Sequence, residues 1–414
     1  MEVPSGVRKS VNVLLCLTAV AGIGWSGTQI WQVLNGRHQI NEACADLVPA
    51  GLVLALSPAG GTISHRVADE GTIELDAALP QDCEIFSTEA GEKYGTDTGE
   101  RWFFTAAVGT LPEDEPVIPE DPVDSLINEW GDHTYPYQPL GGGIAGVVTD
   151  TGVTVELPCP EGEADGPVRT LWSRASLMDP GPPFTENGQL TAHDRNTLAE
   201  IAVTTANNLA GRLGCADRLP DPPQDIPALT EGPLPASRAD GTCAWYRQAG
   251  FARQPRLADQ VLESRPDDKL WDETCGLVLS DGREAEVAYS DAARRADVDR
   301  PSRSGAWFVS FHTYSGEGAK NVQLRRTIPR ESPVLAEPGK AGRGDGGDSL
   351  WWASSVCDGR PQIHTMTIAW EYDELTTPAY EKVFRAYVDD VTQRRGCTNL
   401  KFPAHATFTE QVSS

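Results

Sequence analysis

The first strong pattern along the chain is a long run of uncharged residues near the N-terminus. Arg8 and Lys9 are followed by 27 residues without a charge, from 10 to 36. A helix over residues 11–34 would be about 36 Å long at about 1.5 Å per residue, which exceeds the roughly 30 Å hydrocarbon core of a bilayer. The pattern therefore predicts a transmembrane anchor over 11–34.

The charges beside this segment predict its orientation. Arg8 and Lys9 outnumber the one acidic residue that precedes the span, Glu2. The positive-inside rule therefore places residues 1–10 in the cytoplasm and the rest of the chain outside. The alternative is a signal peptide, because Ala19-Val20-Ala21 has the small-x-small form of a cleavage site and cleavage would release a secreted protein. We expect the anchor to be retained, since the apolar run continues well past that site.

Beyond the anchor, two long stretches show the same order of patterns. Each contains short runs of β-branched, aromatic and polar residues, which predict antiparallel strands, and each ends with a segment of helical periodicity. The closing segments run from Leu190-Thr191 to Gly214-Cys215 and from Leu375-Thr376 to Gly396-Cys397. We interpret the two stretches as diverged copies of one domain.

The predicted fold class is therefore α+β, with a single N-terminal transmembrane helix and two tandem related domains, each an antiparallel sheet packed with a long C-terminal helix. The repeats are predicted at 41–220 and 238–403. Six prolines between residues 220 and 235 predict an extended, Pro-rich linker at 221–237, and residues 404–414 are predicted as a tail.

Three local features complete the predicted secondary structure. A further helix over about 41–56 opens the first repeat, and a strand is expected over 285–289 in the second. Thr377 and Pro378 suit an N-cap followed by proline at the first helical position, and Gly396 suits the C-terminal end of the same helix.

Eight cysteines follow the predicted span and recur at similar intervals in the two repeats. They are Cys44, Cys83, Cys159, Cys215, Cys243, Cys275, Cys357 and Cys397. If the repeats are equivalent, the first two cysteines of each repeat pair with one another, and so do the last two. Metal binding is the competing interpretation, but no two cysteines have the close spacing of a zinc site and no histidine stands beside one at ligand spacing. We expect four structural disulfides and no metal site.

The charge of the chain limits its partners. The formal net charge is -26, which argues against nucleic acid and against docking on anionic lipid through a basic surface. The acids are unevenly shared: residues 37–220 hold 9 basic and 30 acidic residues, whereas 221–414 hold 23 basic and 29 acidic residues. A cluster of prolines and acids at 111–124 predicts an exposed loop in the first repeat.

The sequence contains no recognised catalytic or cofactor motif. It has no G-x-S-x-G elbow, no H-E-x-x-H, no phosphate-binding loop and no G-x-G-x-x-G after a strand, so we expect no cofactor. His312 and His364 lie in strand-like runs and, gathered with an acid such as Glu371, would favour an enzyme. Trp351 and Trp352 are adjacent in a predicted strand, so one should be buried and the other is a candidate contact residue for binding.

The composition completes the interpretation. Arginine outnumbers lysine 27 to 7, and Ala, Gly, Asp and Pro are abundant. With the anchor and the Gly-Cys helix ends, the chain resembles in style the uncharacterised exported and membrane-anchored proteins of actinobacteria, which implies a cell-envelope location and assigns no functional residue. The favoured hypothesis is a non-enzymatic, membrane-anchored binding or interaction module with an envelope protein or cell-wall partner. The alternative is a cell-envelope hydrolase whose site is assembled from dispersed residues.

Overall fold

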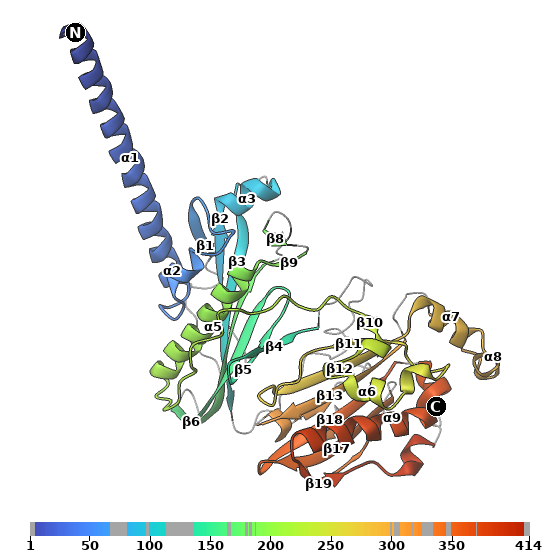
Figure 1. The fold of residues 1–414 in the computed structure, drawn as a ribbon. Helices are drawn as coiled ribbons and strands as arrows, with labels where there is room; N and C mark the ends of the chain where they lie inside the picture. The colour runs from blue at the N-terminus through green and yellow to red at the C-terminus, as the bar shows by residue number, and fades with distance from the viewer. Residues whose placement is uncertain are drawn as a thin grey trace.

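Two antiparallel sheets, each with its own buried core, divide the molecule into two lobes (Figure 1). We call the part with a core drawn from residues 40–229 the first lobe and the part with a core drawn from 236–408 the second lobe. The computed structural model describes residues 5–66, 81–96, 99–112, 136–163, 167–178, 181, 184–186, 188–298, 300–301, 307–316, 318–320, 322–324, 334–344, 349–369 and 371–409. The acidic segment at 111–124 lies outside this set from residue 113 onward.

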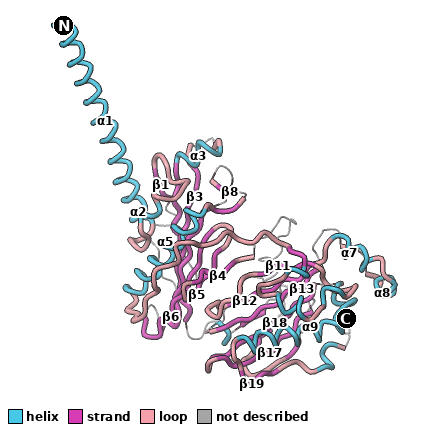
Figure 2. Tube along the Cα trace, viewed as in Figure 1, coloured by secondary structure: helices cyan, strands magenta, loops and turns pink. Residues whose placement is uncertain are grey.

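The sheet of the first lobe has the strand order β1-β2-β3-β7-β6-β5-β4. Its strands are β1 (Ile63–Arg66), β2 (Gln81–Ser87), β3 (Arg101–Pro112), β4 (Gln138–Gly141), β5 (Ile144–Val148), β6 (Gly152–Glu163) and β7 (Pro167–Leu177). A separate two-stranded ribbon joins β8 (Thr185–Glu186) to β9 (Gln189–Leu190). Figure 2 shows the strands of each lobe gathered into one group with helices beside it.

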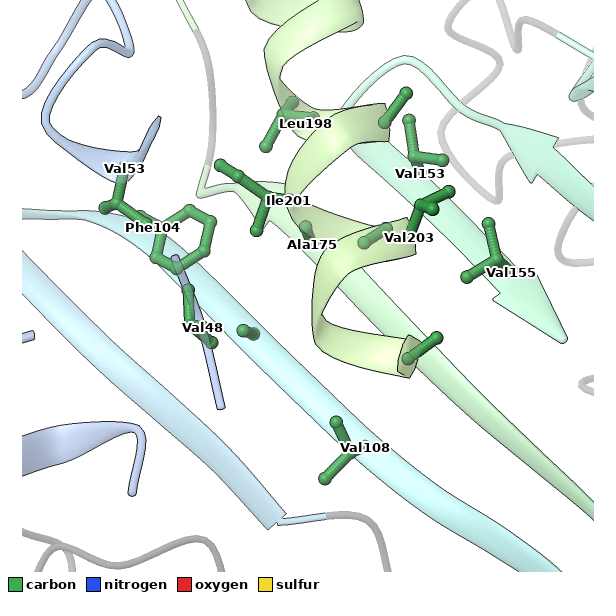
Figure 3. Close-up of a cluster of buried hydrophobic side chains, with 14 of the residues drawn as sticks. Val48, Val53, Phe104, Val108, Val153, Val155, Ala175, Leu198, Ile201 and Val203 are labelled. Carbon is green, nitrogen blue, oxygen red and sulfur yellow. The ribbon is translucent and has the colours of Figure 1, made fainter. Parts of the chain in front are cut away.

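Helix α5 (Ala192–Arg212) covers one face of this sheet, because its apolar side is buried against β6 and β7. Leu198 and Ile201 are fully buried and lie among Phe104 of β3 and Val153 of β6, as Figure 3 shows. The helix begins at Thr191, whose hydroxyl accepts a hydrogen bond from the backbone of Asp194. A shorter helix of this lobe, α3 (Thr88–Tyr94), is capped by Ser87 in the same way.

Helix α1 (Ser5–Ala43) is continuous through the predicted span and then enters the first lobe, where Ile40 is fully buried. Its stretch Leu14–Ala43 is long and apolar enough to cross a membrane, by length and composition. Figure 1 shows it projecting away from both sheets. The predicted helix over 41–56 is wrong: the chain leaves the helix at Ala45 and Asp46, whose φ angles are 50° and 56°, and only α2 (Ala50–Val53) follows.

The sheet of the second lobe has the order β10-β11-β12-β13-β18-β17-β16, with β19 paired to β17. Its strands are β10 (Leu234–Pro235), β11 (Gln260–Glu263), β12 (Asp272–Val278), β13 (Phe308–Ser315), β16 (Gly342–Arg343), β17 (Ser349–Cys357), β18 (Arg360–Ile368) and β19 (Thr398–Lys401). A separate ribbon pairs β14 (Val322–Leu324) with β15 (Val334–Ala336). The order β11-β12-β13-β18-β17 is the counterpart of β1-β2-β3-β7-β6, so the two sheets share a topology.

Helix α9 (Tyr372–Arg394) packs on this sheet as α5 packs on the first. The smaller helices are α6 (Ala244–Gln248), α7 (Asp281–Ala288) and α8 (Asp291–Ala296), with short 3₁₀ turns η1 (Ala236–Arg238), η2 (Phe251–Arg253), η3 (Gly318–Lys320) and η4 (His405–Phe408). The predicted strand over 285–289 is therefore wrong. Ser280 caps α7 by accepting a hydrogen bond from the backbone of Arg283, which favours a helix there.

The predicted start of α9 is also wrong. The helix begins at Tyr372, so Pro378 lies inside it rather than at its first position. Tyr372 is fully buried, stacks on Trp307 at a ring distance of 5.7 Å and donates its hydroxyl to the backbone oxygen of Arg256. This tertiary packing extends the helix toward its N-terminus in spite of the proline.

Both long helices end in the same motif. In α9, the backbone N–H of Cys397 donates to the oxygen of Thr392 and that of Gly396 to Gln393, with Gly396 at φ 62°. In α5, the N–H of Cys215 donates to the oxygen of Ala210. These six-to-one bonds define a Schellman ending, in which the left-handed position favours glycine.

The structure joins the eight exported cysteines in the pairs that the two repeats predict. The disulfides are Cys44–Cys83, Cys159–Cys215, Cys243–Cys275 and Cys357–Cys397. Cys159–Cys215 and Cys357–Cys397 each tie the chain just past the end of a long helix to a strand of the neighbouring sheet.

The Pro-rich linker and the tail pack more closely than the sequence predicts. Asn207 bonds the backbone of Leu219, and Asn196 accepts a hydrogen bond from the backbone of Ile226, so the linker runs back along α5. Its end forms β10 and joins the second sheet. In the tail, Phe408 is buried in the second lobe, and residues 410–414 lie outside the described set.

Candidate functional site

The two lobes are in direct contact at strand β4, the edge strand of the first sheet. Gln138 is buried and donates from Nε2 to the backbone oxygen of Glu263 at 3.3 Å, while its Oε1 accepts from the backbone N–H of Arg265 at 3.0 Å. The hydroxyl of Tyr137 donates to the backbone oxygen of Asp272 at 3.0 Å. Burial and Asp272 together hold the pKa of Tyr137 well above its usual value, so this phenol stays protonated. These bonds fix one lobe against the other.

A cleft of about 710 Å³ lies next to this contact, with walls from both lobes. The first lobe contributes residues of β5, β6 and β7, including Ala145 and Glu156. The second lobe contributes the segment before β12, the turn between β17 and β18, and the C-terminal end of α9. A volume of this size is within the range of small-molecule sites in proteins, about 300 to 1,000 Å³.

Two adjacent arginines at the end of α9 line the cleft and are held by several hydrogen bonds. The carboxylate of Glu273 on β12 is fully buried and accepts hydrogen bonds from the guanidinium groups of both Arg394 and Arg395, the latter at 2.9 Å. Arg395 also donates to Oε1 of Gln362 at 3.0 Å, and only 4% of its side chain is exposed. Asp390 accepts from Nε of Arg394 at 3.0 Å. Because the buried carboxylate is paired twice, both guanidinium groups are held in place.

Two further cations line the same cleft. The side chains of Lys269 and Arg360 are exposed, and neither makes an ion pair with any residue that the structure describes. Two acids, Asp268 and Asp358, line the cleft as well. The second lobe therefore presents exposed cationic side chains beside the fixed arginines.

The facing wall of the first lobe carries Glu156, which the strand register sets opposite Trp172. Burial raises the pKa of the Glu156 carboxyl to about 8. The carboxyl is therefore largely protonated near neutral pH and does not oppose the cations across the cleft. The cleft also has apolar surface, from Pro158 and Pro160 of the first lobe and Trp271 of the second.

The histidines suggested by the sequence do not assemble into a site. His364 pairs in register with Thr313, the neighbour of His312, so the two imidazoles lie on opposite faces of the sheet. Neither histidine lines the cleft, and nor does Glu371, which stands at the start of α9.

His364 belongs instead to a buried hydrogen-bond network under α9. Its Nδ1 and Nε2 are each 2.9 Å from a hydroxyl oxygen, of Thr313 and Ser355 respectively, and Thr313 is 2.7 Å from the hydroxyl of Tyr387. Burial, assisted by the charge of Arg395, lowers the pKa of His364 to about 3. The imidazole is neutral at all ordinary pH values and has a structural role.

His312 lies on the other face of the second sheet. Its Nδ1 is 3.0 Å from both carboxylate oxygens of Asp272, and its ring stacks on Tyr314 at 5.6 Å. Its Nε2 is buried without a hydrogen-bond partner among the described residues. The arrangement orients the ring and gives it no access to the cleft.

The two adjacent tryptophans point to opposite faces of β17. Trp351 is fully buried, stacks on Phe408 at 5.1 Å and donates to the backbone oxygen of Thr407. Trp352 is half-buried against Gly342 and a small apolar cluster, and its indole nitrogen is buried without a partner among the described residues. In the described part of the chain the pair forms no open aromatic patch.

Little in the sequence indicates the residues that line the cleft. They come from eight separate segments of the chain, and the usable signal is the pair Arg394-Arg395 directly before a Gly-Cys helix end. Within the described residues, no group of three or more His, Cys, Asp or Glu side chains could hold a metal ion. No protein-family model, curated protein or solved structure matches the chain.

Proposed function

We propose that the protein is an extracytoplasmic binding protein, held at the membrane by α1, whose ligand binds in the cleft between the two lobes. The observation that carries this proposal is a cleft of about 710 Å³ with walls from both lobes, next to hydrogen bonds that join them. An apolar N-terminal helix and four disulfides are features of an extracytoplasmic protein, because structural disulfides persist in oxidising compartments. In this account the N-terminus is cytoplasmic and both lobes lie outside.

The two lobes are, in this proposal, diverged copies of one domain, as the sequence patterns suggest. The shared strand order, the Schellman endings at Cys215 and Cys397, and the serine caps at Ser87 and Ser280 support it. A duplicated scaffold creates a cleft between its copies without needing a new fold, and each copy can then supply one wall of a binding site.

The binding function is tested with the full chain in phosphatidylcholine nanodiscs. A panel of sugars, amino acids, carboxylates, amines and phosphate esters is screened by thermal shift. We expect at least one compound to raise the melting temperature of the wild type but not of Ala145→Trp, which fills the cleft. Ala406→Trp, at an exposed position in the second lobe, is the control and should respond like the wild type. If every stabilising compound also stabilises Ala145→Trp, the cleft is not the binding site.

A second candidate function, a hydrolase, is favoured by one observation. Glu156 has a pKa raised to about 8 by burial and lies in the same cleft as the carboxylates Asp268 and Asp358. A protonated carboxyl beside an ionised one is the usual arrangement for general acid catalysis. The two functions are separated by incubating each stabilising compound with the wild type and with Glu156→Gln. Binding without conversion in both supports a binding protein, and conversion that Glu156→Gln abolishes supports the hydrolase.

A further inference from the structure

The cationic wall of the cleft stands out against the charge of the whole chain. The protein has a formal net charge of -26, yet Lys269, Arg360, Arg394 and Arg395 of the second lobe all line one cavity. Asp268 and Asp358 line it too, and Glu273 lies behind it. Concentrating cations in one cavity of an acidic protein is costly unless an anionic ligand uses them, because like charges repel in a partly desolvated site.

The arginine pair is fixed before any ligand arrives. Glu273 has no exposed surface and accepts from both guanidinium groups, and Gln362 holds Arg395 from a second direction. The Nε of Arg395 is buried and has no hydrogen-bond partner within the described residues. A rigid, partly buried cation loses little conformational entropy when a ligand binds, so its contribution to affinity is retained.

Lys269 and Arg360 differ from this pair because they are free to engage a ligand. Both are exposed, and no described acid lies within ion-pair distance of either. A phosphate group accepts several charge-assisted hydrogen bonds from separate directions, whereas a carboxylate is fully matched by one bidentate arginine. Several separate cations around one cavity therefore favour phosphate over carboxylate.

Apolar surface in the cleft suits an uncharged organic part. Trp271 of the second lobe is half-exposed there, and Pro158 and Pro160 add apolar surface on the first-lobe side. Glu156 on this wall is the one carboxyl there, and burial disfavours its ionised form. Arg169 of β7 also lines the cleft from the first lobe, so the cleft has cations from both lobes and apolar surface beside them.

The position of the cleft favours a soluble ligand over a lipid. Helix α1 enters the first lobe beside β1, at one edge of the sheet. The cleft is lined by β5 and β6, near the other edge, and Figure 1 shows α1 projecting away from them. A ligand that diffuses in the aqueous space outside the membrane reaches this position directly.

We propose that the cleft binds a soluble phosphate ester, with Lys269 and Arg360 contacting the phosphate, the fixed Arg394 completing the cationic wall, and Trp271 packing against the organic part. This assignment rests on the proposed function, because it places the ligand in the same cleft. It adds the chemical class of the ligand and the residues that select it.

The test is calorimetric titration of the full chain in phosphatidylcholine nanodiscs with four probes: glucose 6-phosphate, glucose, glucuronate and inorganic phosphate. We expect glucose 6-phosphate to bind more tightly than each of the other three. Lys269→Gln and Arg360→Gln should each weaken its binding by about tenfold or more, the usual effect of losing a charge-assisted hydrogen bond. Lys382→Gln, an exposed lysine of α9 outside the cleft, is the matched control and should bind like the wild type.

The outcomes separate the ligand class from the site. If glucose or glucuronate binds as tightly as glucose 6-phosphate, and Ala145→Trp abolishes that binding, the phosphate assignment is wrong and the proposed function stands. Equal affinity for inorganic phosphate would contradict the contact with an organic part. If no probe binds and the broader panel finds no cleft-dependent ligand, both proposals fall. In nanodiscs that contain phosphatidic acid, we expect the affinity for glucose 6-phosphate to be unchanged. If that lipid competes with glucose 6-phosphate, the proposal that the ligand is soluble is wrong.

Discussion

The two lobes share a scaffold and differ at the positions that face the cleft. Each has the same central strand order and a long helix that ends in a Schellman motif closed by a disulfide. Two residues before that closing cysteine, the first lobe has Leu213, which is buried in its core, and the second has Arg395, which pairs with Glu273. The scaffold therefore depends on caps, glycines and disulfides, while a few exchanged side chains decide what each lobe presents to a ligand.

The lobes also differ in their buried titratable groups. In the first lobe, burial raises the pKa of Glu156 to about 8. In the second, burial lowers the pKa of His364 to about 3. Both groups are held neutral, but one is an acid and the other a base, so changes of pH act on the two lobes in opposite directions. Four predictions compare the stability of the two lobes. Each is measured by hydrogen exchange of peptides from both lobes.

The largest expected effect is the response of the second lobe to acid. The unfolded chain binds a proton on His364 below pH 6.5, whereas the folded chain does so only near pH 3. Its free energy of unfolding should therefore fall by about 1.4 kcal/mol for each pH unit below 6.5, toward a total of about 5 kcal/mol. His364→Gln should remove this part of the pH dependence. An unchanged acid profile in His364→Gln would show that the imidazole does not titrate on unfolding.

Removing the closing disulfides should affect the lobes about equally. The loops closed by Cys159–Cys215 and Cys357–Cys397 span 56 and 40 residues. Replacing either pair with alanines should lower the free energy of unfolding of its own lobe by about 4 kcal/mol, because the unfolded chain regains loop entropy. The hydrogen exchange of the other lobe is the internal control. Loss of protection in both lobes from one replacement would contradict the view that they fold around separate cores.

Removing the buried carboxylate should destabilise the second lobe alone. Glu273→Gln leaves Arg394 and Arg395 without their shared partner and should cost about 3 kcal/mol. Glu286→Gln is the matched control, because its ion pair with Arg283 is 70% exposed on the glutamate side and should contribute under about 1 kcal/mol. If Glu273→Gln and Glu286→Gln lower the free energy of unfolding equally, Glu273 does not hold the two arginines in a buried ion pair.

The smallest effect is expected at Glu156. Because the folded state keeps its proton up to about pH 8, the first lobe should become less stable as pH rises from about 4.5 to 8. Glu156→Gln has no proton to lose, so it should gain stability relative to the wild type over that window. We expect a gain of about 1 to 2 kcal/mol at pH 8, since water in the cleft reduces the effect of burial. A gain that does not depend on pH would contradict the raised pKa.

The sequence predicted best the features that are set locally. The Gly-Cys helix ends and the cysteine pairing follow from residues that act within one turn or recur at matching places. The failures come from tertiary contacts. Because Tyr372 is buried, α9 begins before Pro378 and contains it. Ser280 and Asp281 begin a helix where the sequence predicts a strand over 285–289.

The cleft lay beyond prediction from the sequence for a physical reason. Its walls come from strands and turns far apart in the chain, and they meet only because β4 docks on the second lobe through Tyr137 and Gln138. The charge imbalance between the two halves of the chain is visible in the sequence, but the gathering of Lys269, Arg360 and Arg394 at one cleft is not. Glu156 alternates along its strand like an ordinary solvent-facing residue, yet it is half-buried in the cleft and its pKa is raised.

A ligand site shared by the two lobes can be tested by hydrogen exchange of the full chain in nanodiscs with and without glucose 6-phosphate. We expect slower exchange in two places at once: β6 of the first lobe, and the second-lobe segments that carry Lys269 and Arg394. The same protection should be absent with glucose. Protection confined to one lobe, or equal protection with glucose, would contradict a phosphate site shared between the two walls.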